Sequence, residues 1–199
     1  MSQNGTAGQS PMSLQSGPWA GSCPARRVDR GPWSRNPARA YNLGMTVSLR
    51  SYDPHDFAAL HRLDQACFPV GISYSKITLH YFLTISSADC IVAADDKRIA
   101  GFILTEENPP LAHVITLDVA EAYRGQGVGS ALLVESERNL GLRGVRSILL
   151  ETAVENEAAV AFWKKHGYRI EAVLKRYYLS RLDAYEMGKR LLAPPPITP

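Results

Sequence analysis

Apolar positions recur along this chain at two spacings, one typical of helices and one typical of strands. The first helical stretch begins after Asp53-Pro54, where an aspartate cap precedes a proline at the first helical position. The apolar side chains of this helix are Phe57, Leu60, Leu63 and Cys67. The sequence Phe68-Pro69-Val70-Gly71 ends it, and residues 75–85 are predicted to form a second helix.

Shorter apolar runs separated by turn residues predict the strands of one sheet. The predicted strands are residues 47–51, 90–94, 99–105, 113–119, 145–151, 168–174 and 184–191. The turn Asp95-Asp96-Lys97 joins two of them into a hairpin, and the run at 145–151 is so apolar that we expect burial on both faces. Two further helices are predicted at 130–140, closed by Gly141, and at 156–166, with Gly167 at the C-terminal cap position. This order of elements predicts an α/β domain with a mixed sheet.

Both ends of the chain lack either spacing. Residues 1–44 are rich in Gly, Ser, Pro, Asn and Arg, so they bury too little apolar surface to offset their ordering entropy, and we expect a disordered basic tail. Residues 193–199, with three consecutive prolines, are expected to form a second disordered tail, which leaves 45–192 as the folded domain. Two interpretations of the first tail stay open: a transit peptide, or a reading frame extended upstream of a start at Met45.

The net charge of +3 resides in the first tail. Five arginines and one aspartate give residues 1–44 a net charge of +4, so the domain itself is near −1. This balance gives no reason to expect a nucleic acid partner, and no run of 18 apolar residues suggests a membrane span. Three scattered cysteines have no zinc-binding spacing, so we expect a cytoplasmic protein without a metal.

A glycine-rich turn separates the predicted strand at 113–119 from the helix at 130–140, and it reads Arg124-Gly125-Gln126-Gly127-Val128-Gly129-Ser130. Its glycines let the backbone approach a ligand closely, and the N–H groups of the turn and of the helix start favour an anion such as a diphosphate. A Walker A loop is excluded because no lysine follows the glycines. A dinucleotide fingerprint fits imperfectly because Ser130 replaces its last glycine and several strands precede the loop, although Glu151 stands about where the ribose-binding acid would be.

A second block decides among these readings. It reads Asn156-x-x-Ala159-x-x-Phe162-Trp163-x-x-x-Gly167-Tyr168. Together with Arg124-x-x-Gly127-x-Gly129, it resembles the acetyl-CoA-binding motifs of the GNAT superfamily of N-acetyltransferases, and the resemblance covers roughly residues 45–192. It implies the GNAT fold, with a mixed central sheet of about six to seven strands flanked by about four helices.

Two shorter elements resemble the protein N-terminal acetyltransferases of that superfamily, the group that contains the ribosomal-protein alanine acetyltransferases. One is Phe68-Pro69-Val70-Gly71-Ile72-Ser73-Tyr74 and the other is Lys175-Arg176-Tyr177-Tyr178. The resemblance implies that both wall the acceptor peptide. The residues expected to bind it are Phe68, Pro69, Val70, Tyr74, Tyr177 and Tyr178. For the two adjacent tyrosines, simple cross-strand packing is the alternative.

The resemblance also implies where acetyl-CoA, the co-substrate, binds. A backbone N–H of the strand at 113–119 is expected to face the thioester oxygen as negative charge develops on it. The residues expected to bind the cofactor are Leu117, Asp118, Val119, Arg124, Gly125, Gln126, Gly127, Val128, Gly129, Ser130, Asn156 and Trp163.

Glu151 matches the family position of the general base, which would act through a water molecule, and His113 on the neighbouring strand is expected to share this role. The alternatives are a strand-end carboxylate and a structural histidine. Trp163 departs from the tyrosine that protonates the leaving thiolate in the bacterial group, and an indole N–H is no acid near neutral pH. Tyr177 or Tyr178 then supplies the proton, or the thiolate, with a pKa of about 8.5, leaves unaided, or the enzyme is slow or inactive.

The expected function is transfer of acetyl to the α-amino group of a protein N-terminus by a monomer or weak dimer, with Glu151, His113, Tyr177 and Tyr178 as the catalytic candidates. Two alternatives stay open. The acceptor could instead be lysine, a polyamine or another small amine, or the chain could be a CoA-binding module without catalysis, for which Trp163 is the support.

Overall fold

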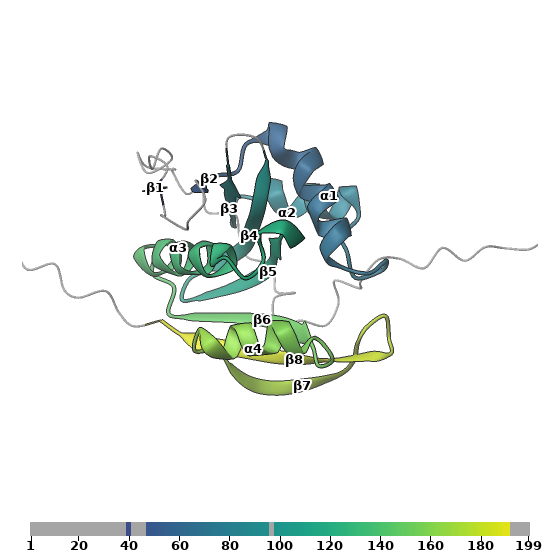
Figure 1. The fold of residues 1–199 in the computed structure, drawn as a ribbon. Helices are drawn as coiled ribbons and strands as arrows, with labels where there is room; N and C mark the ends of the chain where they lie inside the picture. Colours follow the sequence, from purple (N-terminus) through teal and green to yellow (C-terminus); the bar gives the residue numbers. More distant parts are fainter. Residues whose placement is uncertain (1–38, 41–46, 96–97, 192–199) are drawn as a thin grey trace, which may run out of the picture. The chain divides into compact units, whose positions relative to one another are not determined.

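The computed structural model describes residues 39–40, 47–95 and 98–191, and it combines one mixed sheet with four α-helices (Figure 1). The strands are β1 (Arg39–Ala40), β2 (Ser48–Ser51), β3 (Ala88–Ala94), β4 (Ile99–Asn108), β5 (Leu111–Val119), β6 (Ser147–Ala153), β7 (Arg169–Tyr178) and β8 (Leu182–Arg190). The helices are α1 (Phe57–Cys67), α2 (Lys76–Thr84), α3 (Val128–Leu142) and α4 (Glu157–Lys165), with 3₁₀ turns η2 (Pro54–Asp56) and η3 (Glu121–Tyr123). The predicted tails lie outside the described residues, apart from β1.

The strand order is β1-β2-β3-β4-β5-β6-β8-β7. All neighbouring strands are antiparallel except β5 and β6, which run parallel, so a helical crossover, α3, joins them. The predicted α/β fold with a mixed sheet is confirmed, since β2 to β8 form the expected seven strands and β1 adds a two-residue edge.

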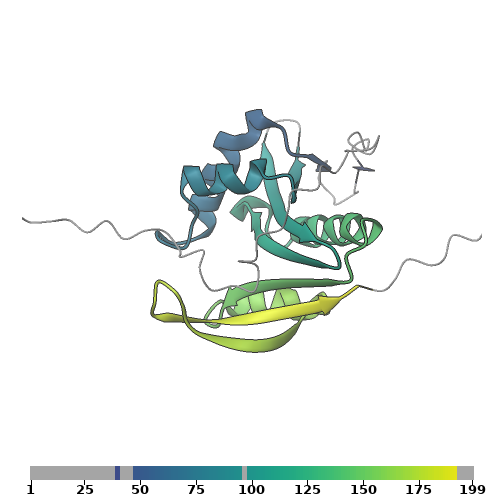
Figure 2. The same ribbon diagram turned by 180° about the vertical axis from the view of Figure 1, so that it is seen from behind.

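Helix α3 covers one face of strands β3 to β5, and α1 and α2 cover the other, whereas α4 lies beside β6 and β8 (Figures 1 and 2). On one face, Leu132 and Leu133 of α3 join a core cluster that includes Ile103 of β4. On the other face, Leu60 of α1 and Leu79 of α2 pack with Phe102 of β4. This layering follows from the helical spacing of the apolar positions, because each helix has one apolar side to bury.

The start of α1 follows the predicted signal. Asp53 caps η2 by accepting the His55 N–H at 2.8 Å, and Asp56 accepts the Asp53 N–H at 2.9 Å, which completes a capping box in front of the helix. The predicted proline at the first position is also found. The capping box therefore belongs to η2, which leads directly into α1, and the N-cap residue of α1 itself, Asp56, makes no side-chain cap hydrogen bond.

Two details of the predicted elements are wrong. Gly141 lies inside α3, which continues to Leu142, and the chain turns at Gly144, which has a left-handed φ of +93°. Strand β6 is buried on one face only: Ile148 and Leu150 lie in the core, whereas Leu149 alternates with them at intermediate exposure. An apolar run could not reveal that the sheet parts beside this strand and leaves one face partly open.

We expect opposite effects from alanine at two glycines. A Cβ on Gly101 of β4 would lie 2.6 Å from the Asp118 carbonyl oxygen, a backbone atom that cannot move without shifting β5. Gly101→Ala should lower the free energy of unfolding by about 1–3 kcal/mol. A Cβ on Gly141 would meet nothing closer than 3.8 Å. Gly141→Ala should therefore raise the free energy of unfolding by about 0.5–1 kcal/mol, because alanine has a higher helix propensity than glycine. Urea unfolding of both variants checks this, and a Gly101→Ala midpoint equal to that of the parent would contradict it.

Candidate active site

The pairing between β5 and β6 is short. It covers Leu111 to His113 on β5 and Ser147 to Leu149 on β6, and in the described part of the chain the two strands form no further pairs. Beyond that point, the β6-facing N–H and C=O groups of β5 have no strand partner. Buried or half-buried backbone groups require hydrogen bonds, so this parting of the strands is a place where a ligand could supply them.

A bulge in β5 shapes the same region. The pairing with β4 shifts register between Leu104 and Thr105, which leaves Ile115 as the extra residue on β5. Val114 and Leu117 consequently both pack against the core under α3, although they are an odd number of residues apart. Ile115 instead packs against the cluster under α1 and α2. The bulge thus determines which side chains at the end of β5 face α3 and which face α1 and α2.

The glycine-rich loop joins the end of β5 to α3. Gly125 and Gly127 have left-handed φ angles of +72° and +86°, which explains why glycine is needed at both, and a Cβ on Gly125 would meet no atom within 4 Å. Gly127 is the N-cap residue of α3. The N–H groups at this helix start are therefore available to an anion that approaches through open space.

Two polar side chains of the loop, Arg124 and Gln126, form hydrogen bonds with other residues of the protein. Arg124 Nε donates to the Val119 carbonyl oxygen at 3.0 Å, and its Nη2 lies 3.6 Å from Cys67 Sγ. Gln126 Nε2 donates to the Ala122 carbonyl oxygen at 2.7 Å. These contacts fix the loop onto the end of β5, so they leave anion binding chiefly to the backbone.

The two cofactor candidates in the second motif have internal contacts. The Asn156 side chain accepts the Ala159 N–H at 3.1 Å and so caps α4. Trp163 is only 7% exposed and packs edge-on against Tyr168 at 5.2 Å between ring centroids. Their predicted contact with the cofactor stays a prediction, and the structure places Trp163 in the core.

His113 and Glu151 form the central polar pair of the site. His113 Nε2 lies 2.8 Å from Glu151 Oε2, and the side chains are 21% and 16% exposed. The register explains the contact: His113 is level with Leu149, and Glu151 follows two residues later on the same face of β6. Two residues predicted to share the role of the base are thus brought into hydrogen-bond contact.

The two adjacent tyrosines both reach Glu151 from β7, Tyr178 at its backbone and Tyr177 at its carboxylate. Tyr178 Oη donates to the Glu151 carbonyl oxygen at 3.2 Å, and the rings of Tyr177 and Tyr178 meet edge to face at 4.9 Å. Burial raises the pKa of both phenols, and the charge of Glu151, together with a hydrogen bond to it, raises the pKa of Tyr177 further. Both phenols are therefore protonated hydrogen-bond donors at neutral pH. Their raised pKa makes them weak acids toward a thiolate.

A strained turn holds these tyrosines in place. Arg176, Leu179 and Ser180 all have φ near +55°, which is unusual for residues with side chains. Asp183 stabilises the start of this turn, because its carboxylate accepts the Arg176 N–H at 2.9 Å and the Lys175 ammonium at 2.7 Å.

The two predicted acceptor elements meet. Gly71, in the loop between α1 and α2, has a φ of +90°, and a Cβ there would lie 2.7 Å from Leu179 Cδ2 in the turn between β7 and β8. Tyr74 Oη donates to the Ile115 carbonyl oxygen at 3.3 Å, and burial raises the pKa of this phenol. Val70, by contrast, is 93% exposed. The loop therefore meets the turn at Leu179 and reaches the bulge of β5 through Tyr74.

Sequence reasoning missed Asp64. This α1 residue is fully buried, and its carboxylate accepts the Tyr74 N–H at 2.8 Å, while Gln65 Nε2 donates to the Tyr74 carbonyl oxygen at 2.9 Å. A signal was present, because Asp64 occupies an inward helical position four residues after Leu60. An acid at such a position indicates a specific partner, here the backbone of the acceptor loop.

Asp64 has an unexpected neighbour in Asp118 of β5, which is 1% exposed. Asp118 accepts the Thr116 hydroxyl at 2.6 Å through one oxygen. Its other oxygen, and one oxygen of Asp64, are buried without a hydrogen-bond partner among the described residues. Desolvation, followed by the nearby charge of Asp64, raises the pKa of Asp118 to about 8, and desolvation also raises the pKa of Asp64.

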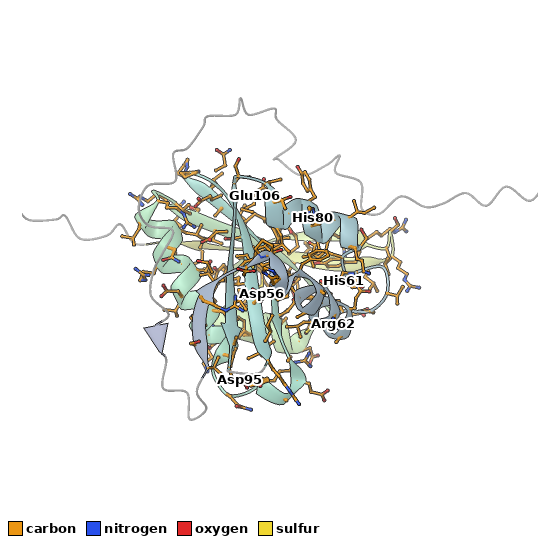
Figure 3. All side chains as sticks on the ribbon, turned by 90° about the horizontal axis from the view of Figure 1, so that it is seen from above. Asp56, His61, Arg62, His80, Asp95 and Glu106 are labelled. Carbon is orange, nitrogen blue, oxygen red and sulfur yellow. The ribbon has the colours of Figure 1, made fainter. Side chains whose placement is uncertain are left out.

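A surface hollow of about 520 Å³ lies elsewhere, and no predicted site residue lines it. Asp56, Arg62 and Asp95, which border it, are labelled in Figure 3. Among the described residues, no group of His, Cys, Asp and Glu is arranged to hold a metal ion, and no helix is long and apolar enough to cross a membrane.

Comparisons with known proteins show the family and the fold. The model of the acetyltransferase (GNAT) family matches residues 57–168. N-alpha-acetyltransferase 30 of Schizosaccharomyces pombe is 32% identical over 117 residues, which are 56% of this chain and 78% of that protein.

Two solved structures share the fold. The NatC complex bound to Gag peptide and CoA aligns with a TM-score of 0.66 and 25% identity, over 73% of this chain and 99% of the other. The ribosomal-protein-S18-alanine N-acetyltransferase from Escherichia coli gives a TM-score of 0.68 over 76% and 99% of the two chains, and at 23% identity it supports the fold alone.

The raised pKa of Asp118 predicts a pH-dependent stability. Its folded-state pKa of about 8 exceeds its ordinary value of 3.8, so between these values the folded protein holds a proton that the unfolded chain has lost. The free energy of unfolding should therefore fall as pH rises from 5 to 8, by up to about 1.4 kcal/mol per pH unit. Asp118→Asn should flatten this slope and stabilise the protein at pH 8. Urea unfolding at four pH values checks this.

Asp183→Asn is the matched control, because Lys175 and a backbone N–H lower the pKa of Asp183 and confine its effect to acid pH. An Asp118→Asn variant that keeps the parent slope would show that Asp118 is ionised in the folded protein.

Proposed function

Because the chain belongs to the acetyltransferase (GNAT) family, we propose that it transfers an acetyl group from acetyl-CoA to the α-amino group of a protein N-terminus. The observation that carries this proposal is the 2.8 Å contact between His113 and Glu151 where β5 and β6 part. This contact places two proton-accepting side chains where the pairing of β5 with β6 ends and their backbone N–H and C=O groups become available.

The residues present fit acetyl-CoA. The left-handed glycines and the open space beside Gly125 suit a diphosphate at the start of α3, held by the N–H groups of residues 127–130. The edge of β5 at Leu117 and Asp118, which pairs with β4 but not with β6, suits the pantetheine arm, which also needs hydrogen-bond partners. When bound, acetyl-CoA supplies an acetyl thioester whose carbonyl carbon accepts a nucleophile.

The reaction requires only a weak general base. A free α-amino group has a pKa of about 7.7–8.0, so a substantial fraction is already neutral at physiological pH. The amine nitrogen bonds to the acetyl carbon, the carbon–sulfur bond breaks, and the nitrogen loses one proton. Glu151 accepts that proton directly or through water, and His113 stabilises it through their shared hydrogen bond.

The leaving thiolate carries the balancing negative charge. Tyr177 and Tyr178 are protonated and close to Glu151, so they serve as hydrogen-bond donors in the site. Their raised pKa argues against complete proton transfer from either phenol. We therefore favour departure of the thiolate without a dedicated acid, since its pKa of about 8.5 is within reach of solvent protonation.

The meeting of the two acceptor elements supports a peptide as acceptor. The loop at residues 68–74 and the turn at Leu179 lie together beside Glu151, which suits an extended chain entering between them. Relatives of this chain carry the name N-alpha-acetyltransferase, and one related structure holds a peptide and CoA.

The direct test of the acceptor is incubation with acetyl-CoA and one amine at a time. The amines are short peptides that differ in their first residue, free lysine and spermidine. We expect thiol release with at least one peptide and none after its α-amine is blocked. Release with lysine or spermidine alone would contradict the peptide acceptor. Release with no amine in the panel would contradict the proposed activity.

Glu151→Gln should lower kcat by about 10²–10⁴-fold with a small change in KM, because it removes proton acceptance and keeps the shape of the side chain. His113→Gln should lower kcat less, by about tenfold, since it removes only the partner of the base. Glu107→Gln is the matched control, because this carboxylate pairs with Arg143 away from the site. Full activity of Glu151→Gln in steady-state kinetics would refute its assignment as base.

A further inference from the structure

One histidine outside the predicted site contacts the glycine-rich loop. His166 follows α4, and its two ring nitrogens both have partners: Nδ1 lies 2.8 Å from the Phe162 carbonyl oxygen, and Nε2 lies 2.9 Å from Ser130 Oγ. The His166 ring also packs against the Phe162 ring at 4.3 Å between centroids. Three contacts therefore fix this imidazole in one orientation.

The partners determine which nitrogen carries the proton. A carbonyl oxygen only accepts, so Nδ1 must be the protonated nitrogen of the neutral ring. Nε2 is then an acceptor, and the Ser130 hydroxyl must donate to it. In the neutral state, the hydroxyl proton of Ser130 is thus directed toward His166 and away from any ligand at the start of α3.

We infer that His166 is a positioning residue for the cofactor diphosphate, and that its protonation turns the Ser130 hydroxyl toward that diphosphate. This inference rests on the proposed function. When Nε2 gains a proton, it becomes a donor to Ser130 Oγ, and the hydroxyl proton is released to donate elsewhere. A diphosphate oxygen bound at the N-terminus of α3, as proposed above, would accept this hydrogen bond, and the added positive charge would favour it as well.

The packing between the two helices supports this coupling. A Cβ on Gly129 would lie 3.5 Å from Phe162, so the glycine-rich loop and α4 are in close contact beside Ser130. The hydrogen bond from Ser130 to His166 therefore joins the start of α3 to the end of α4.

The charged groups near this end of α4 are mostly basic. Lys164 and Lys165 belong to the last turn of the helix, and Lys189 of β8 approaches Gly167. Lys189 is neutralised by Glu137 of α3 at 2.6 Å. No carboxylate is thus bonded to His166 among the described residues, which leaves an incoming diphosphate as the anion able to stabilise its charged form.

The test is the pH dependence of cofactor binding by the full chain, measured by calorimetry between pH 5.5 and 8.5. Dephospho-CoA is the probe, because it keeps the diphosphate and lacks the phosphomonoester that itself titrates near pH 6. We expect its Kd to tighten about tenfold toward low pH, because the diphosphate gains a hydrogen bond from Ser130 and a nearby positive charge when His166 is protonated. His166→Gln and Ser130→Ala should each remove this dependence.

His55→Gln is the matched control, since this histidine is 98% exposed and lies before α1, and it should keep the dependence. If the role of His166 is only structural, His166→Gln should weaken binding of dephospho-CoA equally at every pH. That result would overturn the inference. A second measurement needs no variant: imidazole nitrogen NMR of the parent protein should show the Nδ1–H tautomer at pH 8, and the other tautomer would also overturn it.

The same titrations separate this inference from the function on which it rests. Binding of dephospho-CoA without pH dependence would overturn the role of His166 alone. Failure to bind either CoA or dephospho-CoA at any pH would overturn the proposed cofactor, and the inference with it.

Discussion

The parallel pairing of β5 with β6 lasts for three residues on each strand, and the arrangement of the site depends on where it stops. If the two strands stayed paired to their ends, β6 would also occupy the backbone groups of β5 that follow His113. Because they part after His113, Glu151 projects into the opening and still reaches His113. The β-bulge at Ile115 contributes to the same result by redirecting the end of β5.

Three elements distant in sequence then meet around this opening. The glycine-rich loop is fastened to the end of β5 by Arg124, the acceptor loop is fastened to α1 by Asp64, and the strained turn after Tyr178 contacts Gly71. Each fastening uses a polar side chain or a left-handed backbone angle, which costs local stability. The surrounding core offsets that cost, since the clusters on both sides of β4 are closely packed.

The buried carboxylates show how tightly the two halves of the site are linked. Asp64 holds the acceptor loop, and Asp118 belongs to the strand that the cofactor is proposed to follow. Desolvation of the Asp118 carboxylate, and to a smaller extent the charge of Asp64, keeps a proton on Asp118 at neutral pH. The acceptor side and the cofactor side of the site therefore share an electrostatic environment beneath α1.

The sequence by itself determined the local and periodic features. The helix starts at Asp53 and Asn156 and the strand order along the chain follow from capping chemistry and side-chain spacing, which act over a few residues. The motifs also indicated the family. Only the tertiary structure decided that His113 touches Glu151, that Gly71 meets Leu179, and that Asp64 lies near Asp118. These contacts join segments far apart in sequence, and they depend on strand register and a single bulge, which no local pattern encodes.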